Sequence, residues 1–130
     1  MTLEPGLQYE SKQIVKESDT AAAFGSGDLY VFSTPMMIGL MENAALKAAQ
    51  QALEEGLSTV GIRLEVDHLA ATPLGMEVRA VATLEEVAGK KLKFRVEAYD
   101  EEGLIGEGYH WRYVIQTEKF MQRVSDKRKV

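Results

Sequence analysis

The stretch STPMMIGLMENAALKAAQQALEEG, residues 33–56, predicts one long helix. Thr34 can serve as its N-cap, and Pro35 fits the first helical position, where its missing N–H would be unpaired in any case. Apolar residues then recur at helical spacing, and Gly56 is a natural stop. Residues 36–41 are apolar on every side, so we expect the first turns of this helix to be buried all round.

After the helix the apolar period changes to two. Such alternation gives each strand a dry side and a wet side, as in an antiparallel sheet. The apolar residues that alternate from Val60 to Val66 are expected on the dry side of the first of these strands. A hairpin turn is predicted at 88–90 and a second turn at 100–103. The predicted strands span residues 59–67, 76–84, 92–98 and 104–116.

The segments before and after this core complete the order of elements. Leu7–Val15 reads as a first strand, 18–28 as a loop rich in small residues, and 118–124 as a short terminal helix. The order is therefore strand, long helix, then four strands joined mainly by hairpins. A sheet with one apolar face must be covered, and the alanine-rich helix is the only long one available.

This order predicts an α+β hot-dog fold, in which an antiparallel sheet of about five strands wraps around one long central helix. The many alanines of the helix allow the sheet to wrap closely. No linker or repeat divides the chain, so residues 1–130 are expected to form one domain.

Composition excludes several classes of function. The chain has 130 residues, no cysteine and two histidines, which argues against a disulfide scaffold, a cysteine nucleophile or a metal site. Its net charge of −5 is unfavourable for nucleic-acid binding. The longest charge-poor run, 35–41, is too short to cross a bilayer, and the N-terminus lacks the layout of a signal peptide. We therefore expect a cytoplasmic protein.

Glu42 is the most informative residue, because it is the only charge between Pro35 and Leu46. Burying an unpaired carboxylate is costly, so Glu42 is expected to be paired, hydrogen-bonded or protonated. One interpretation places it at a helix edge, in contact with solvent or a structural arginine. The other makes it a general base or a water-orienting carboxylate.

Two more residues have both a structural and a catalytic interpretation. His68 lies on the inward parity of its strand, as a satisfied core residue or as an acid–base partner at the strand end. Thr34 is either a simple N-cap or a hydroxyl beside unpaired N–H groups that can hold an oxyanion.

The last strand carries polar residues on one parity. Arg112 shares it with Gly106, Gly108 and His110. An inward arginine needs an anion, either Glu42 or a ligand group. His110 is interpreted as structural, and the glycines as sites of close approach by the helix or a ligand.

Basic residues gather in two places. Those after the last strand read as a solvated end, or as contacts to the phosphates of a nucleotide-bearing substrate. Those of the hairpin at 88–93 are candidates for the same contacts. They are Lys119, Arg123, Lys127, Arg128 and Lys129 at the end, and Lys90, Lys91 and Lys93 in the hairpin.

Three blocks together resemble a known family. Ser33–Ala49 is similar to the central helix of the fluoroacetyl-CoA thioesterase-like group of the hot-dog superfamily. Val60–Val78 resembles that group's strand in which a histidine is followed by A-A-T-P. Ile105–Ile115 resembles its last strand, with glycine, histidine and arginine at the expected places. The resemblance covers roughly residues 29–119.

The resemblance implies roles for five residues. Thr34, Glu42 and His68 match the family's catalytic threonine, glutamate and histidine. Gly61 matches a glycine near the thioester, and Arg112 matches an active-site arginine. It also implies a homodimer, or a dimer of dimers, with sites at the subunit interface. The substrate is an acyl-CoA hydrolysed at its thioester, so coenzyme A is part of the substrate and no cofactor is expected.

One departure bears on the substrate. Residues 19–30 are shorter than in the fluoroacetyl-specific enzyme, and Gly25 and Asp28 stand in or near the place of its aromatic lid. A short or medium acyl-CoA is therefore expected, without fluoroacetyl selectivity. In the expected mechanism N–H groups near Thr34 polarise the carbonyl, while Glu42 and His68 share the proton transfers. A non-hydrolytic acyl-CoA-binding module and an enoyl-CoA hydratase or dehydratase are the alternatives.

Overall fold

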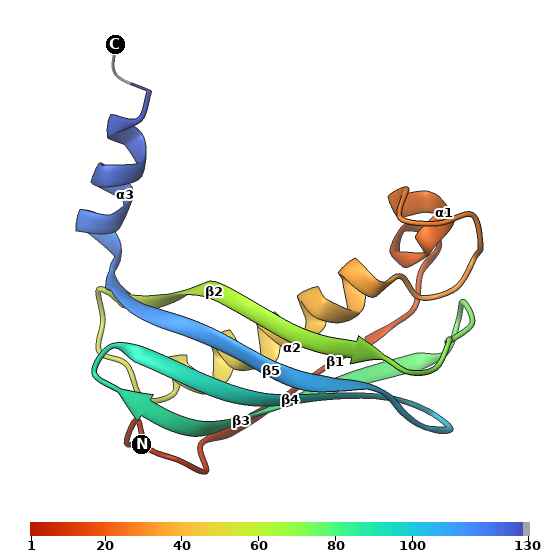
Figure 1. Ribbon diagram of the computed structural model, residues 1–130, viewed down its shortest axis with the longest axis horizontal. Coiled ribbons are helices and arrows are strands. Elements are labelled where there is room, and N and C mark those ends of the chain that lie inside the picture. The colour runs from red at the N-terminus through yellow and green to blue at the C-terminus, as the bar shows by residue number, and fades with distance from the viewer. Residues whose placement is uncertain (129–130) are drawn as a thin grey trace.

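The computed structural model describes residues 1–128 and confirms the predicted order of elements (Figure 1). Lys129, part of the predicted basic tail, lies outside the described residues. The strands are β1 (Gln8–Ile14), β2 (Leu57–His68), β3 (Glu77–Ala88), β4 (Lys91–Asp100) and β5 (Gly103–Gln116). The helices are η1 (Glu17–Asp19, a 3₁₀ turn), α1 (Ala21–Phe24), α2 (Thr34–Gln50) and α3 (Thr117–Asp126).

The predicted α+β hot-dog architecture is confirmed. A five-stranded antiparallel sheet with the order β1-β3-β4-β5-β2 curves around α2 (Figure 1). The turns between β3, β4 and β5 are hairpins, as expected. The connection from β2 to β3 is not, because β2 lies at one edge and β3 lies next to β1 at the other. This crossover leaves β2 as a free edge.

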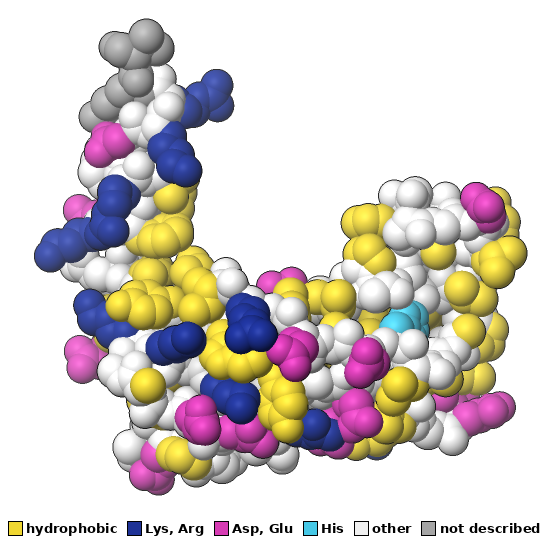
Figure 2. Space-filling model, viewed as in Figure 1, with side chains coloured by type: hydrophobic (Ala, Val, Ile, Leu, Met, Phe, Trp, Pro, Cys, Tyr) yellow, Lys and Arg dark blue, Asp and Glu magenta, His cyan; other side chains and the backbone are white. Residues whose placement is uncertain are grey.

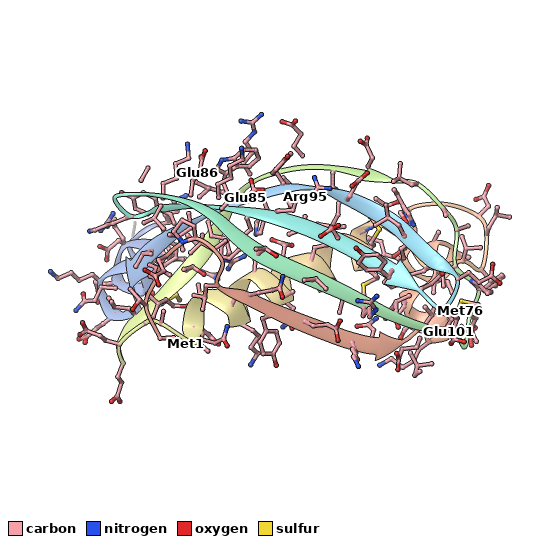
Figure 3. The ribbon with its side chains drawn as sticks, turned by 90° about the horizontal axis from the view of Figure 1, so that it is seen from below. Met1, Met76, Glu85, Glu86, Arg95 and Glu101 are labelled. Atoms are coloured by element: carbon pink, nitrogen blue, oxygen red, sulfur yellow. The ribbon has the colours of Figure 1, made fainter. Side chains whose placement is uncertain are left out.

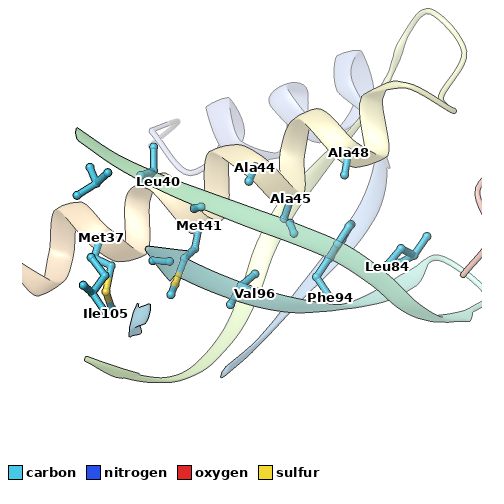
Figure 4. Close-up of a cluster of buried hydrophobic side chains, with 14 of the residues drawn as sticks. Met37, Leu40, Met41, Ala44, Ala45, Ala48, Leu84, Phe94, Val96 and Ile105 are labelled. Atoms are coloured by element: carbon cyan, nitrogen blue, oxygen red, sulfur yellow. The ribbon is translucent and has the colours of Figure 1, made fainter. Parts of the chain in front are cut away.

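The core lies between α2 and the inner face of the sheet (Figure 4). Alanines of α2 are fully buried there, and the alternation predicted for β3 and β4 is confirmed. Gly106 shows how closely the helix approaches, since a Cβ built at this position would lie 2.5 Å from Sδ of Met37. At Gly108 a Cβ would overlap the carbonyl oxygen of Glu65 in β2. Gly106 therefore serves the close approach of the helix that the sequence predicted, whereas Gly108 makes room for the backbone of the neighbouring strand β2.

Both ends of α2 differ from the prediction. Ser33, not Thr34, is the N-cap: its backbone is extended, and its hydroxyl accepts a hydrogen bond from the N–H of Met36 at 3.2 Å. The helix ends at Gln50, well before Gly56, which instead turns the chain into β2 with a φ of 91°. The change at the N-cap leaves the Thr34 hydroxyl free for other contacts.

The segment predicted as a loop at 18–28 contains two short helical turns. The side chain of Thr20 caps α1 by accepting a hydrogen bond from the N–H of Ala23 at 3.3 Å. Three alanines follow this cap, and alanine is the residue that favours helix most. The turns form a projection beside the start of α2 (Figure 1).

A β-bulge interrupts β2 between Gly61 and Arg63. Before the bulge, Thr59 and Gly61 lie opposite residues of β5 whose side chains face the inside of the sheet. After the bulge, Leu64 is the residue that lies opposite an inward-facing residue, His110. The prediction of one continuous dry side was therefore wrong for the first half of β2.

The free edge of the molecule is apolar and flanked by two projections. Ile62 and Leu64 of β2 are 50% and 37% exposed. The turns around α1 and the helix α3 extend past this edge on the same side, one at each end of β2 (Figure 1). On the outer face of the sheet, charged side chains such as Glu86 and Arg95 point away from α2 (Figure 3). Within residues 1–128 no helix is long and apolar enough to cross a membrane.

Candidate active site

The first group of predicted site residues meets at the start of α2. Oγ1 of Thr34 lies 2.7 Å from Nδ1 of His68, the last residue of β2. The loop after His68 is fixed on both sides, because the N–H of Leu69 donates to Ile105 at 2.7 Å and the carbonyl of Thr72 accepts from Phe32 at 2.8 Å. These backbone bonds hold the end of β2 against the helix start.

The Thr34–His68 pair faces a cavity of about 330 Å³. Small side chains form much of its wall, including Ala21 and Ser26 around α1 and Ala70 after β2. His68 is the only ionisable residue in its lining. His68 is half-buried at this cavity, whereas His110 is fully buried in the core. The cavity thus offers an uncharged space with one hydroxyl–imidazole pair.

His68 has the properties of a proton acceptor. Burial lowers its pKa below the ordinary value, and the opposing effect of a backbone contact with Ala70 is smaller. Its Nε2 is buried and has no hydrogen-bond partner among residues 1–128. The ring is therefore neutral at pH 7, with one nitrogen on Thr34 and the other available to a ligand or water.

The lowered pKa of His68 predicts a pH dependence. Activity should fall as pH drops through a pKa below 6.5, because protonation removes the base. The unfolded chain binds this proton more readily than the native protein. The neutral His68 ring therefore contributes fully to the free energy of unfolding at pH values above the pKa of the unfolded chain. This contribution is lost as the pH falls through the lower pKa of the native protein. NMR titration of the ring protons, assigned with His68→Gln, measures the pKa. A value above 6.5 would contradict the assignment.

The helix start offers fewer backbone donors than expected. The N–H of Met36 is already bonded to the Ser33 hydroxyl, and Pro35 has no N–H. Among residues 1–128, the N–H of Thr34 has no partner. One backbone donor, and not several, therefore remains in this turn to polarise a carbonyl oxygen.

A second group forms further along α2. A Cβ built on Gly61 would lie 3.0 Å from Oε2 of Glu42, 3.1 Å from Cε1 of His110 and 3.4 Å from Nη1 of Arg112. Glycine therefore lets the carboxylate sit directly over the backbone of β2. Glu42 raises the pKa of both His110 and Arg112 by its charge, although burial lowers each of them more.

Arg112 is held rigidly in this second group. Its Nε donates to Oγ1 of Thr59 at 2.8 Å, and its Nη2 donates to the carbonyl of Thr59 at 2.9 Å. Nδ1 of His110 lies 2.8 Å from the carbonyl of Arg63, so it must carry the proton. Nε2 of His110 can then accept from Nη1 of Arg112 at 3.0 Å. His110 is thus a structural residue, as predicted.

The two groups are separate within one chain. Glu42 lies about 12 Å beyond Thr34 along the axis of α2. Its carboxylate faces His110 instead of His68, and it forms no ion pair or hydrogen bond with any residue of 1–128. The expected sharing of proton transfers by Glu42 and His68 stays a prediction, and a partner chain would have to bring the two groups together.

Sequence reasoning missed two residues that shape the site. Ser33 takes the cap and frees Thr34, and Thr59 anchors Arg112. Ser33 could have been found as a second capping residue directly before Thr34. The inward position of Thr59 depends on the bulge that follows it, and the isolated Gly61 in the strand was the one signal that could have indicated this bulge.

The sequence of the chain is similar to known thioesterases. Residues 15–118 match a family described as fluoroacetyl-CoA-specific thioesterase. The chain is 44% identical over 97 residues to the fluoroacetyl-CoA thioesterase of Streptantibioticus cattleyicolor. That match covers 75% of this chain and 70% of the relative.

Solved structures agree with the sequence match. A structure of the fluoroacetyl-CoA thioesterase superimposes with a TM-score of 0.90 at 34% identity, covering 98% of each chain. A hypothetical protein from Thermus thermophilus, described as a thioesterase superfamily member, superimposes with a TM-score of 0.86 at 32% identity. The superposition covers 96% of this chain and 95% of the Thermus thermophilus protein. The chain therefore belongs to the fluoroacetyl-CoA-specific thioesterase family, whose members are thioester hydrolases.

Proposed function

We propose that this protein hydrolyses the thioester of short or medium acyl-CoA substrates. The observation that carries the proposal is the Thr34–His68 hydrogen bond at the mouth of an uncharged cavity. A hydroxyl held by a neutral imidazole is the arrangement that nucleophilic or base-assisted acyl transfer requires. The family to which the chain belongs supports the same activity.

The active unit in this proposal is a homodimer. Each chain carries two half-sites, and the apolar edge of β2 between the two projections is open (Figure 1). Antiparallel pairing of two β2 edges about a two-fold axis places the His68 end of one strand next to the opposite end of the other. Thr34 and His68 of one protomer would then face Glu42, Gly61 and Arg112 of its partner.

The chemistry follows from these positions. The thioester carbonyl accepts a hydrogen bond from the N–H of Thr34, which stabilises the oxyanion as the tetrahedral intermediate forms. His68 takes the proton of the attacking hydroxyl, from Thr34 or from water. As the C–S bond breaks, that proton passes to the leaving thiolate. If Thr34 attacks first, water then cleaves the acyl-threonine ester with the same base.

Glu42 and Arg112 of the partner have defined tasks in this proposal. The carboxylate of Glu42 has free acceptor positions, so it can orient the attacking water. The anchored guanidinium of Arg112 supplies positive charge next to that carboxylate and next to the reacting thioester. CoA enters as part of the substrate, and no further cofactor takes part. A cytoplasmic location is included in the proposal, because acyl-CoA thioesters are intracellular metabolites.

The cavity supports an acyl group that is neutral and not restricted to two carbons. Its volume of about 330 Å³ lies at the lower end of the roughly 300–1,000 Å³ that is typical of small-molecule sites. No aromatic side chain of 24–30 lines it, and Phe24 and Tyr30 are exposed. Without an aromatic lid, the cavity has no evident means to select fluoroacetyl from other short acyl groups.

A thiol-release screen across acyl-CoA chain lengths tests the proposed function. We expect free CoA from short and medium chains, with kcat/KM for fluoroacetyl-CoA within about tenfold of acetyl-CoA. A preference for fluoroacetyl-CoA far above tenfold would contradict the proposed specificity. CoA binding without thiol release would show a non-hydrolytic module. Hydration of an enoyl-CoA without thiol release would show a hydratase.

A further inference from the structure

A basic pocket lies at the base of α3, far from the Thr34–His68 pair of its own chain. Its volume is about 310 Å³, and it is formed by the β3–β4 turn, the end of β5 and the first turns of α3. Lys90, Lys119 and Arg123 line it, and no acidic residue does. In a chain of net charge −5, such a pocket is a local site for anions.

The three cations are available to a ligand. None of them forms an ion pair with a residue of 1–128. In Figure 2 dark-blue side chains gather along α3 and at its base, with few acidic side chains among them. Three unpaired cations around one cavity suit a ligand that carries several phosphate charges.

Two aromatic side chains complete the pocket. Tyr113 of β5 is 42% exposed, and Phe120 of α3 is half-buried. Partly exposed aromatic faces beside cations are the features on which nucleotide bases stack while phosphates bind the charges. This combination favours a phosphorylated nucleotide over a simple inorganic anion.

We propose that this pocket binds the phosphorylated adenosine end of the CoA substrate. The proposal rests on the acyl-CoA thioesterase function given above. Lys119 and Arg123 of α3 and Lys90 of the hairpin would contact the phosphates, and Tyr113 or Phe120 would stack on the adenine.

The proposed dimer determines which active site such a pocket serves. The N–H of Thr117 donates to the carbonyl of Gly56 at 2.9 Å, which ties the start of α3 to the start of β2. His68 ends the same 12-residue strand, about 36 Å away at about 3.3 Å per residue. In the antiparallel dimer, however, the His68 end of the partner lies beside α3. The pocket of one protomer therefore serves the Thr34–His68 pair of the other.

Charge-reversal variants test the proposal without depending on turnover alone. Lys119→Glu and Arg123→Glu are each compared with Lys12→Glu, which makes the same charge change on β1 at the opposite edge of the sheet. Each α3 variant should raise KM for an acyl-CoA about tenfold. KM for the matching acyl-N-acetylcysteamine thioester, which lacks the nucleotide, should stay within about twofold. The acyl-CoA KM should also rise with salt, less steeply in the variants.

The outcomes separate this proposal from the proposed function. Equal effects of Lys119→Glu and Lys12→Glu, or equal effects on both thioesters, would overturn the pocket assignment. Calorimetry with adenosine 3′,5′-bisphosphate needs no catalysis: binding that Lys119→Glu weakens about tenfold supports the pocket, and absence of binding overturns it. A protein that binds this nucleotide but releases no thiol would contradict the thioesterase function alone.

Discussion

Replacing His68 with alanine is expected to lower kcat for acyl-CoA hydrolysis by about 10²–10⁴-fold. The imidazole is the only ionisable group in the cavity, and its Nδ1 lies 2.7 Å from the Thr34 hydroxyl. No other side chain there can accept the proton of the attacking oxygen. The measurement is thiol release at saturating substrate, with thermal unfolding of both proteins to show that the variant is folded.

Two variants of Thr34 serve as a matched pair for this result. Thr34→Ser keeps the hydroxyl next to His68 and should retain most of the activity. Thr34→Val keeps the shape but removes the hydroxyl. A large loss in Thr34→Val alone assigns a role to the hydroxyl, and acyl-enzyme detected by mass spectrometry would assign it as the nucleophile. A kcat for His68→Ala within tenfold of the wild type would contradict the role of His68 as base.

The parts of the fold that the sequence predicted are those set by periodicity. Alternation in β3 and β4 is confirmed because both strands lie inside the sheet, with one face on α2 and one in solvent. The buried stripe of α2 is confirmed for the same reason, but the expectation that residues 36–41 are buried all round was wrong, because Met36 and Ile38 are half-buried and Gly39 is exposed. In these elements the pattern of burial depends on the local geometry of the strand or helix and on a single packing partner. The sequence of this chain alone is therefore enough to predict the pattern.

The features that were predicted wrongly depend on contacts that the periodic pattern of apolar residues does not predict. Ser33 and Thr34 are adjacent, and either type of residue can cap a helix. The N-cap is the one whose backbone is extended, and in this structure that residue is Ser33. The bulge after Gly61 reverses the parity of β2, and its one signal in the sequence is that isolated glycine inside the strand. β2 is also a free edge, so its exposed Ile62 and Leu64 do not follow the burial of an inner strand.

The sequence predicted which residues belong to the candidate site, but it did not predict how they are arranged in space. Thr34 and His68 meet, as do Glu42, Gly61 and Arg112. The separation of these two groups could not be predicted, because the spacing of residues along α2 does not show which sheet residue faces each turn of the helix. That arrangement is also the feature from which the shared site of the homodimer is inferred.

Glu42→Gln is expected to lower kcat by about 10²–10⁴-fold, as for His68→Ala, because it removes the carboxylate that orients water. The amide is almost the same size, so the packing over Gly61 is preserved. The stronger prediction concerns a mixture of the two inactive proteins. If each active site combines His68 of one protomer with Glu42 of its partner, a heterodimer of the two variants contains one intact site and one doubly altered site.

Random exchange of equal amounts of His68→Ala and Glu42→Gln chains should therefore restore about a quarter of the wild-type activity, since half of the dimers are mixed and half of their sites are intact. Subunits are exchanged by brief denaturation and refolding, and each variant treated alone is the control. A double variant carrying both changes on one chain, mixed with the wild type, controls for exchange itself. If both groups act within one chain, the mixture stays as inactive as its components, and the shared site is excluded.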